Sequence, residues 1–210
     1  MTDPLLEVEP ATAAALFGDR LEIARAYTND LARRGEELGL IGPLELPRLW
    51  SRHILNCALL APLLKPGTIG DIGSGAGLPG LVLAIARPDV TMVLIEPMER
   101  RVDWLIAESA ELGLDNVKVI RARAEDTKLD WPLDQVTARA VTALSKLIPA
   151  TAPLVRSGGE MLFLKGSRVQ EEIAAAAKEI RRARLADIEV IELGSGIVDD
   201  VTRVFRATVD

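Results

Sequence analysis

Cysteine and histidine are almost absent from this chain of 210 residues. It has one cysteine, Cys57, and one histidine, His53. A single thiol forms no disulfide within the chain, and one thiol with one imidazole supplies too few ligands for a zinc-type cluster. We therefore expect a reducing compartment and no bound metal.

Aromatic residues are also scarce, at 3% of the chain. The core must therefore be built mainly from aliphatic side chains. With so few aromatic side chains, a surface that stacks the bases of single-stranded nucleic acid is not expected. The three tryptophans, Trp50, Trp104 and Trp131, are accordingly interpreted as packing residues.

Long apolar runs and excess positive charge are missing as well. The longest apolar candidate, residues 55–64, is interrupted by Asn56 and Pro62 and is too short to span a bilayer. The first four residues lack the basic start and apolar run of a signal peptide. We expect a soluble cytoplasmic protein that acts as a monomer and does not bind membranes. Its net charge of -6 argues against indiscriminate binding of nucleic acid, although a local basic face remains compatible with it.

The hydrophobic pattern changes near Pro66. Before it, two stretches with helical periodicity predict a helical region, the second over residues 46–64. After it, short apolar runs alternate with amphipathic stretches. The predicted strands are 68–72, 90–96, 117–121, 135–138, 159–165, 186–193 and 202–209, and the predicted helices are 79–86, 99–112, 145–155 and 169–184.

This alternation predicts an α/β fold with a doubly wound, mostly parallel sheet that has helices on both faces. We assign residues 1–66 to an N-terminal helical cap that is not an independent domain. Residues 67–210 form the sheet domain.

A glycine-rich turn, Gly73-Ser74-Gly75-Ala76-Gly77, joins the first predicted strand to the following helix. Glycines allow a sharp turn and a close approach of the backbone to a ligand, and the helix N-terminus offers free N–H groups. Two ligand classes fit, because the spacing from Gly75 to Gly80 also satisfies the dinucleotide fingerprint. Asp71 favours S-adenosylmethionine, because its carboxylate can meet an ammonium group but would repel a pyrophosphate.

Two further acidic positions follow later predicted strands. Glu96 ends the second strand about twenty residues after the glycines, where carboxylates bind ribose hydroxyls in such folds. Ala124 and Glu125 follow the third strand, where a backbone N–H and an acceptor commonly hold an adenine. This third signal is weak by itself.

Four segments in matching order resemble the glucose-inhibited division protein B family, the guanine-N7 methyltransferases of small-subunit ribosomal RNA. They are Leu49-Trp50-Ser51-Arg52-His53-Ile54-Leu55-Asn56, the stretch from Asp71 to Gly80, Thr137-Ala138-Arg139-Ala140, and Leu164-Lys165-Gly166. The likeness covers nearly the whole chain and is of the actinobacterial type. One departure is Leu40-Ile41-Gly42-Pro43, which replaces a polar segment found in many members.

The resemblance implies a Rossmann-like methyltransferase domain that transfers a methyl group to N7 of one guanine in a 16S rRNA loop near the decoding site. The cofactor is then S-adenosyl-L-methionine, its product S-adenosyl-L-homocysteine, and the partner is 16S rRNA or an assembling 30S subunit. Family cofactor positions correspond to Gly73, Leu78, Ala124, Glu125 and Arg139. With the residues argued above, the predicted cofactor set is Asp71, Gly73, Gly75, Gly77, Leu78, Glu96, Ala124, Glu125 and Arg139.

Guanine N7 carries an in-plane lone pair and no proton, so methyl transfer to it needs no general base. We therefore predict no catalytic acid or base, only positioning, with Arg139 as the candidate for an active-site role. Basic side chains near the strand ends are predicted to contact RNA. This predicted RNA set is Arg52, His53, Arg139, Lys165 and Arg168.

Two other functions remain open from the residues alone. A small-molecule methyltransferase would share the whole cofactor site and differ by having an enclosed apolar pocket. A nucleotide-binding regulator without catalytic activity would bind the cofactor but not consume it.

Overall fold

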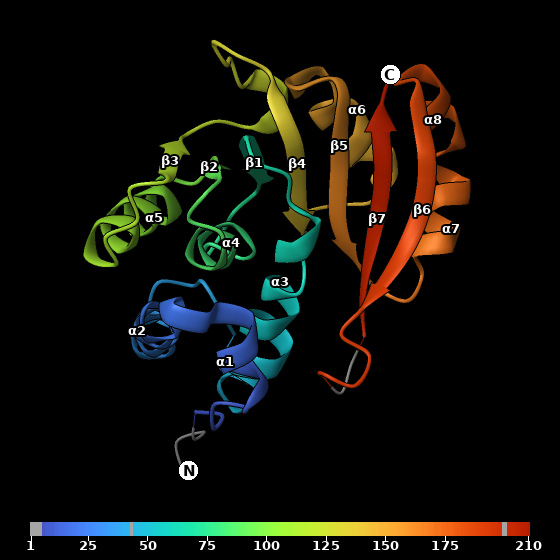
Figure 1. The fold of residues 1–210 in the computed structure, drawn as a ribbon. Coiled ribbons are helices and arrows are strands. Elements are labelled where there is room, and N and C mark those ends of the chain that lie inside the picture. The colour runs from blue at the N-terminus through green and yellow to red at the C-terminus, as the bar shows by residue number, and fades with distance from the viewer. Residues whose placement is uncertain (1–5, 43, 199–200) are drawn as a thin grey trace.

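In the part of the chain that the structure describes, seven strands form one sheet in the order β3-β2-β1-β4-β5-β7-β6 (Figure 1). The computed structural model describes residues 6–42, 44–198 and 201–210. Strands β1 to β5 run parallel, and β7 runs antiparallel to both of its neighbours. The strands are β1 (Thr68–Ile72), β2 (Thr91–Ile95), β3 (Val117–Ile120), β4 (Leu133–Arg139), β5 (Val155–Lys165), β6 (Leu185–Leu193) and β7 (Thr202–Val209).

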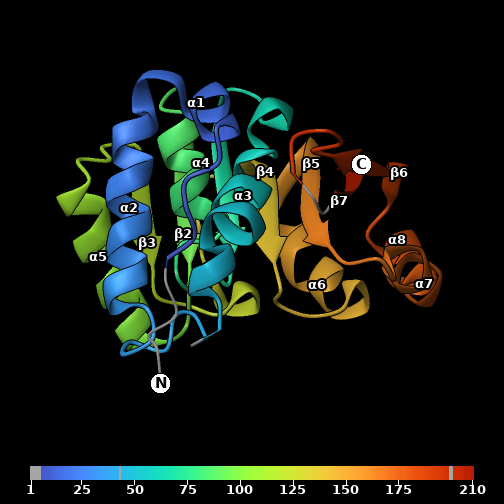
Figure 2. The ribbon, with the colours of Figure 1, turned by 90° about the horizontal axis from the view of Figure 1, so that it is seen from below.

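Helices cover both faces of the sheet. Figure 2 shows α2, α4 and α5 together at the left and α6, α7 and α8 grouped at the right. The helices are α1 (Thr12–Phe17), α2 (Leu21–Arg34), α3 (Asn56–Ala58), α4 (Gly80–Ala86), α5 (Glu99–Glu111), α6 (Leu144–Thr151), α7 (Val169–Ala175) and α8 (Ala177–Arg182). The doubly wound, mostly parallel α/β architecture predicted from the sequence is therefore confirmed.

Two buried clusters hold these layers together, one on each face of the sheet, because successive strand residues point to opposite faces. The first cluster joins Leu31 and Leu49 of the N-terminal region to Leu81 of α4 and Leu94 of β2. The N-terminal helices thus share their core with the sheet. The second cluster packs β4, β5 and β7 against α6 to α8, and it includes the stacked rings of Phe163 and Phe205, 6.0 Å apart.

Several predicted elements differ in detail from the structure. The helix predicted over 46–64 is a series of short turns, with π-helical geometry over Leu49–Leu55 and a 3₁₀ turn at Ala61–Leu63. The helix predicted over 145–155 ends at Thr151, and β5 already begins at Val155. The charged helix predicted over 169–184 is divided at Ala176, whose φ and ψ of -93° and 9° leave the helical range.

The prediction that the tryptophans are packing residues is confirmed for two of the three. Trp50 and Trp104 are buried, whereas Trp131 is 42% exposed and its ring lies 4.6 Å from the ammonium group of Lys118. The packing interpretation of Trp131 is therefore wrong. Among the described residues, no helix combines the length and the apolarity that crossing a membrane requires.

Candidate functional site

The glycine turn lies at the carboxyl end of β1 and leads into α4. Gly73, Gly75 and Gly77 have φ angles of 68°, 58° and 98°, a backbone region that side chains disfavour. A Cβ on Gly73 would lie 2.9 Å from a methyl group of Val141, in the loop after β4. A Cβ on Gly75 would meet no atom closer than 3.8 Å. The backbone angle at position 75 thus favours glycine, and the space beside this residue is open.

Asp71 is completely buried beneath this turn. Its Oδ2 accepts a hydrogen bond from the Gly80 N–H at 2.9 Å, while Oδ1 is buried without a hydrogen-bond partner among the described residues. Burial raises the pKa of Asp71 to about 7, against the opposing effect of its hydrogen bonds. One carboxylate oxygen therefore fixes the start of α4, and the other remains available to a donor.

Glu96 follows β2 and faces the same turn. Its Oε2 accepts the Gly75 N–H at 2.9 Å, and its Oε1 accepts the Met98 N–H at 3.0 Å. The residue is only 2% exposed. The carboxylate predicted to bind ribose is thus held at the glycine turn by two backbone groups, with further lone pairs on each oxygen.

Two aromatic residues hold the turn from behind. The Tyr27 hydroxyl of α2 donates to the Ala76 carbonyl oxygen at 3.0 Å, and the Trp104 indole N–H of α5 donates to the same oxygen at 2.9 Å. Both side chains are buried. Sequence reasoning missed these contacts, because a buried aromatic residue carries no signal that its polar atom will meet a distant backbone carbonyl.

Arg139 ends β4 and is held by the N-terminal region. Its Nη2 donates to His53 Nδ1 at 2.6 Å and to the Arg52 carbonyl oxygen at 3.4 Å, and its Nη1 lies 3.4 Å from Cys57 Sγ. On its other side, His53 Nε2 lies 2.6 Å from Glu45 Oε2. Because a guanidinium only donates, His53 Nδ1 accepts and Nε2 carries the proton that it donates to Glu45.

Burial, and then the charge of Arg139, lower the pKa of His53, although Glu45 opposes the shift. The imidazole is therefore neutral at physiological pH. Glu45, His53 and Arg139 form a hydrogen-bonded row, named here the Arg139 row, that aims the guanidinium. The sequence singled out His53 and Arg139 without indicating that they touch.

Lys165 ends β5 and is only slightly exposed. Its ammonium group donates to the Thr142 carbonyl oxygen and to Glu172 Oε2, both at 2.8 Å. Glu172 Oε2 also accepts the Leu144 N–H at the start of α6, at 3.0 Å. Lys165 therefore ties β5 to the loop after β4 and to α7. Its predicted contact with RNA stays a prediction.

A groove of about 1200 Å³ opens beside these strand ends. Among the residues that the structure describes, its lining carries five cationic side chains and two carboxylates, Glu171 and Glu172. The cations are Arg52, Arg139, Lys165, Arg168 and Arg203. Arg203 was missed by sequence reasoning. It reaches this edge because antiparallel β7 begins where β4 and β5 end, which a strand prediction without pairing does not reveal.

The remaining predicted residues lie around the turn. Leu78 is half-buried and precedes α4, while Ala124 and Glu125 form a short 3₁₀ turn after β3, with Glu125 exposed. Because β3 is parallel to β2 and β1, its carboxyl end lies at the same edge of the sheet. The fold thus brings the predicted cofactor positions to one edge, as parallel strands require.

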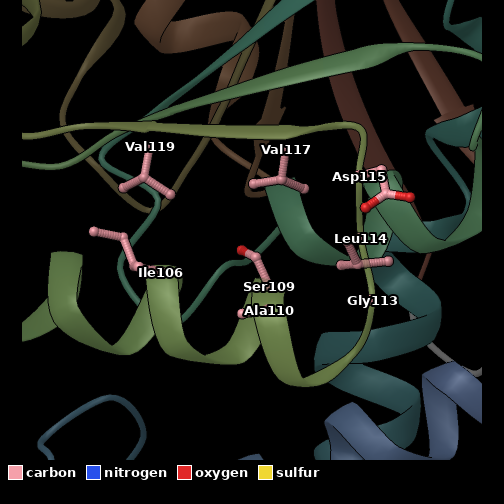
Figure 3. Close-up of a pocket in the computed structure, with 8 residues that line it drawn as sticks. All are labelled: Ile106, Ser109, Ala110, Gly113, Leu114, Asp115, Val117 and Val119. Atoms are coloured by element: carbon pink, nitrogen blue, oxygen red, sulfur yellow. The ribbon is translucent and has the colours of Figure 1, made fainter.

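A smaller pocket of about 310 Å³ lies between α5 and β3 (Figure 3). Ile106, Ala110 and Val119 are among its lining residues, and Ser109 and Asp115 contribute polar groups. It contains none of the predicted site residues. The basic groove and the glycine turn therefore remain the candidate site.

Comparisons with known proteins agree on one family. The model of the family described as rRNA small subunit methyltransferase G matches residues 20–197. A relative from Leifsonia xyli, named ribosomal RNA small subunit methyltransferase G, is 68% identical over 209 residues, which cover the full length of both chains.

Solved structures share the fold at low sequence identity. A geranyl diphosphate methyltransferase in complex with GPP and sinefungin aligns with a TM-score of 0.60 at 16% identity, covering 91% of this chain and 99% of its own. A SAM dependent methyltransferase from Aquifex aeolicus aligns with a TM-score of 0.55 at 17% identity, covering 78% and 93%. The sheet therefore has the fold of such methyltransferases.

Proposed function

Because the chain belongs to the rRNA small subunit methyltransferase G family, we propose that it transfers a methyl group from S-adenosylmethionine to N7 of one guanine in 16S rRNA. The observation that carries this proposal is the placement of the glycine turn next to an open basic groove, with Arg139 near both. An enzyme for ribosomal RNA would work in the cytoplasm, where ribosomes assemble.

The residues around the turn fit the proposed cofactor. Asp71 has a buried oxygen that finds no hydrogen-bond partner in the described part of the chain and suits an ammonium group, directly or through water. Glu96 stands at the strand end where ribose-binding acids lie, and the open space at Gly75 admits a close approach to the backbone. When bound, S-adenosylmethionine supplies a methyl group attached to a positively charged sulfur.

The protein's own contribution is positioning. Guanine N7 has a free in-plane lone pair, so no side chain must remove a proton. The Arg139 row holds a guanidinium in one orientation in the lining of the groove, where it can bind a phosphate or a base edge. Fixed orientation of both reactants is the main source of rate in such a transfer.

The shape of the groove favours RNA over a small metabolite. A metabolite site would be an enclosed, mostly apolar pocket, whereas this groove is open and, among the described residues, is lined by five cationic side chains. Arg52 and Arg168 line the groove, are exposed, and are assigned to phosphate contacts. A regulator without catalytic activity is disfavoured by membership in a methyltransferase family.

The test is methyl transfer from labelled S-adenosylmethionine to 30S subunits that lack the modification, in parallel with naked 16S rRNA. We expect label in one guanine, located at N7 by mass spectrometry of the nucleosides. The better of the two substrates identifies the form that the enzyme recognises. Absence of label from guanine N7 in both would reject the proposed reaction. Light scattering of the same preparation checks the expected monomer.

A further inference from the structure

Three carboxylates meet between α2 and α5, outside the basic groove. Asp30 comes from α2, and Glu108 and Glu111 come from the end of α5. One oxygen atom of each lies within 4.8 Å of the others. The fold thus brings Asp30 close to two residues about eighty positions later in the chain, although carboxylates at this distance repel one another.

Glu108 is the least satisfied member of this acidic cluster. It is 0% exposed, and neither of its carboxylate oxygens has a hydrogen-bond partner among the described residues. An ionised carboxylate without a partner is costly to bury. Burial, followed by the charges of Asp30 and Glu111, raises the pKa of Glu108 to about 7. Both of its oxygens are available to a ligand.

Nearby cations compensate the cluster only in part. Arg33 pairs with Asp30, and the guanidinium of Arg34 lies over the Trp104 ring, 5.0 Å from its centroid. Their charges oppose the raised pKa of Glu108 without cancelling it. The last turn of α5 carries no basic residue, and its carbonyl groups add negative potential. The site is therefore short of positive charge.

We propose that Asp30, Glu108 and Glu111 bind a hard divalent cation, best matched by Ca²⁺. Such ions take carboxylate and water oxygens, and Ca²⁺ accepts bidentate carboxylates in flexible geometry. Glu108 can offer both oxygens, while exposed Glu111 leaves one side open for water. The sequence argument against a metal considered only cysteine and histidine, and this site uses neither.

Such an ion would join the two helices that hold the glycine turn. Tyr27 lies three residues before Asp30 in α2, and Trp104 lies four residues before Glu108 in α5. Both donate to the Ala76 carbonyl oxygen. The cation would thus fasten the N-terminal helices to the sheet domain at a site separate from the proposed chemistry, so its test does not depend on methyl transfer.

Trp104 supplies a direct probe, because Tb³⁺ occupies Ca²⁺ sites and emits when a nearby indole transfers energy to it. We would titrate the full-length protein with Tb³⁺ in metal-free buffer and then add Ca²⁺. Saturable emission that Ca²⁺ displaces is expected. Glu108→Gln and Glu111→Gln should each weaken binding by about tenfold or more. Asp103→Asn, an exposed acid on the same helix, is the matched control and should bind as the wild type does.

Thermal unfolding gives a second measurement that needs no emission. Ca²⁺ should raise the Tm of the wild type and of Asp103→Asn, and should leave that of Glu108→Gln unchanged. If Glu108→Gln folds poorly, exposed Glu111→Gln carries the comparison. Saturable binding that is equal in all variants would place the ion elsewhere and overturn the proposal. A wild type that responds to pH but not to Ca²⁺ would show that Glu108 holds a proton instead, and would also overturn it.

Discussion

Gly75 and Gly113 offer a matched pair of substitutions to alanine. Their φ angles are 58° and 62°, and a Cβ at either position meets no atom closer than 3.8 Å. Each substitution should therefore cost about 1–2 kcal/mol of backbone strain, measured by urea unfolding. Only Gly75→Ala should weaken binding of S-adenosylhomocysteine, by about tenfold or more in calorimetry, because its methyl group occupies the approach to the turn. Equal binding by both variants would remove Gly75 from the cofactor site.

His53 is expected to act by orienting Arg139. His53→Phe removes the acceptor for the guanidinium and should slow methyl transfer by about 10²-fold. His53→Gln keeps an acceptor and should retain most of the activity. Far-ultraviolet circular dichroism and the Tm check that both variants fold. Equal loss in the two variants would show that the ring itself, and not the bond to Arg139, is what matters.

The same histidine predicts a pH dependence of stability. Its pKa is lowered in the folded protein, so the unfolded chain takes up the proton first as pH falls below about 6.5. The unfolded state then binds more protons, and this group makes the free energy of unfolding decrease as pH falls through that range. In His53→Gln this contribution should disappear from urea titrations at successive pH values. An unchanged pH profile would contradict the neutral imidazole.

Helices and strands were predicted well where the hydrophobic pattern alone determines them. Strand β2 is an almost unbroken apolar run, and β1 matches its predicted bounds of residues 68–72. The break at Ala176 had no such signal, because alanine is a good helix former and the residue is buried in the second cluster. In the candidate site, the glycine turn and Arg139 were predictable from position along the chain. The bonds of Tyr27 and Trp104 depend on packing between distant helices and were not.

Lys165 ends β5 and Arg168 follows it, but we expect Lys165 to hold the fold together and Arg168 to contact RNA. Lys165→Met removes the partner of Glu172 and of the Thr142 carbonyl oxygen and should cost about 1–3 kcal/mol in the free energy of unfolding. Arg168→Met, at an exposed position, should change stability by less than about 0.5 kcal/mol and weaken RNA binding. Urea unfolding and filter binding measure the two effects. A Lys165→Met protein with wild-type stability and reduced RNA affinity would instead place Lys165 on the substrate.

For the whole molecule, the distribution of positive charge and the position of the basic groove were only partly predictable from the sequence. A net charge of -6 does not indicate where positive groups gather. The basic groove forms because the carboxyl ends of β4 and β5 and the start of β7 meet the π-helical segment Leu49–Leu55, which carries Arg52. The sequence pattern indicated that β4 and β5 end at this edge of the sheet. The direction of β7 depends on which edge it pairs with, so the contribution of Arg203 became visible only in three dimensions.

The N-terminal region, residues 1–66, is expected to be inseparable from residues 67–210. Leu31 and Leu49 belong to the same buried cluster as Leu81 and Leu94, and the Tyr27 hydroxyl bonds to the glycine turn. A fragment of residues 67–210 would expose this apolar surface, each large side chain costing about 1.5–3 kcal/mol. It should therefore lack a cooperative thermal transition in circular dichroism and should not bind S-adenosylhomocysteine. Adding the 1–66 fragment should restore both properties, because the shared core can re-form without a covalent link. A cooperative, cofactor-binding 67–210 fragment would show that the cap is a separable attachment and that the turn is held from the sheet side alone.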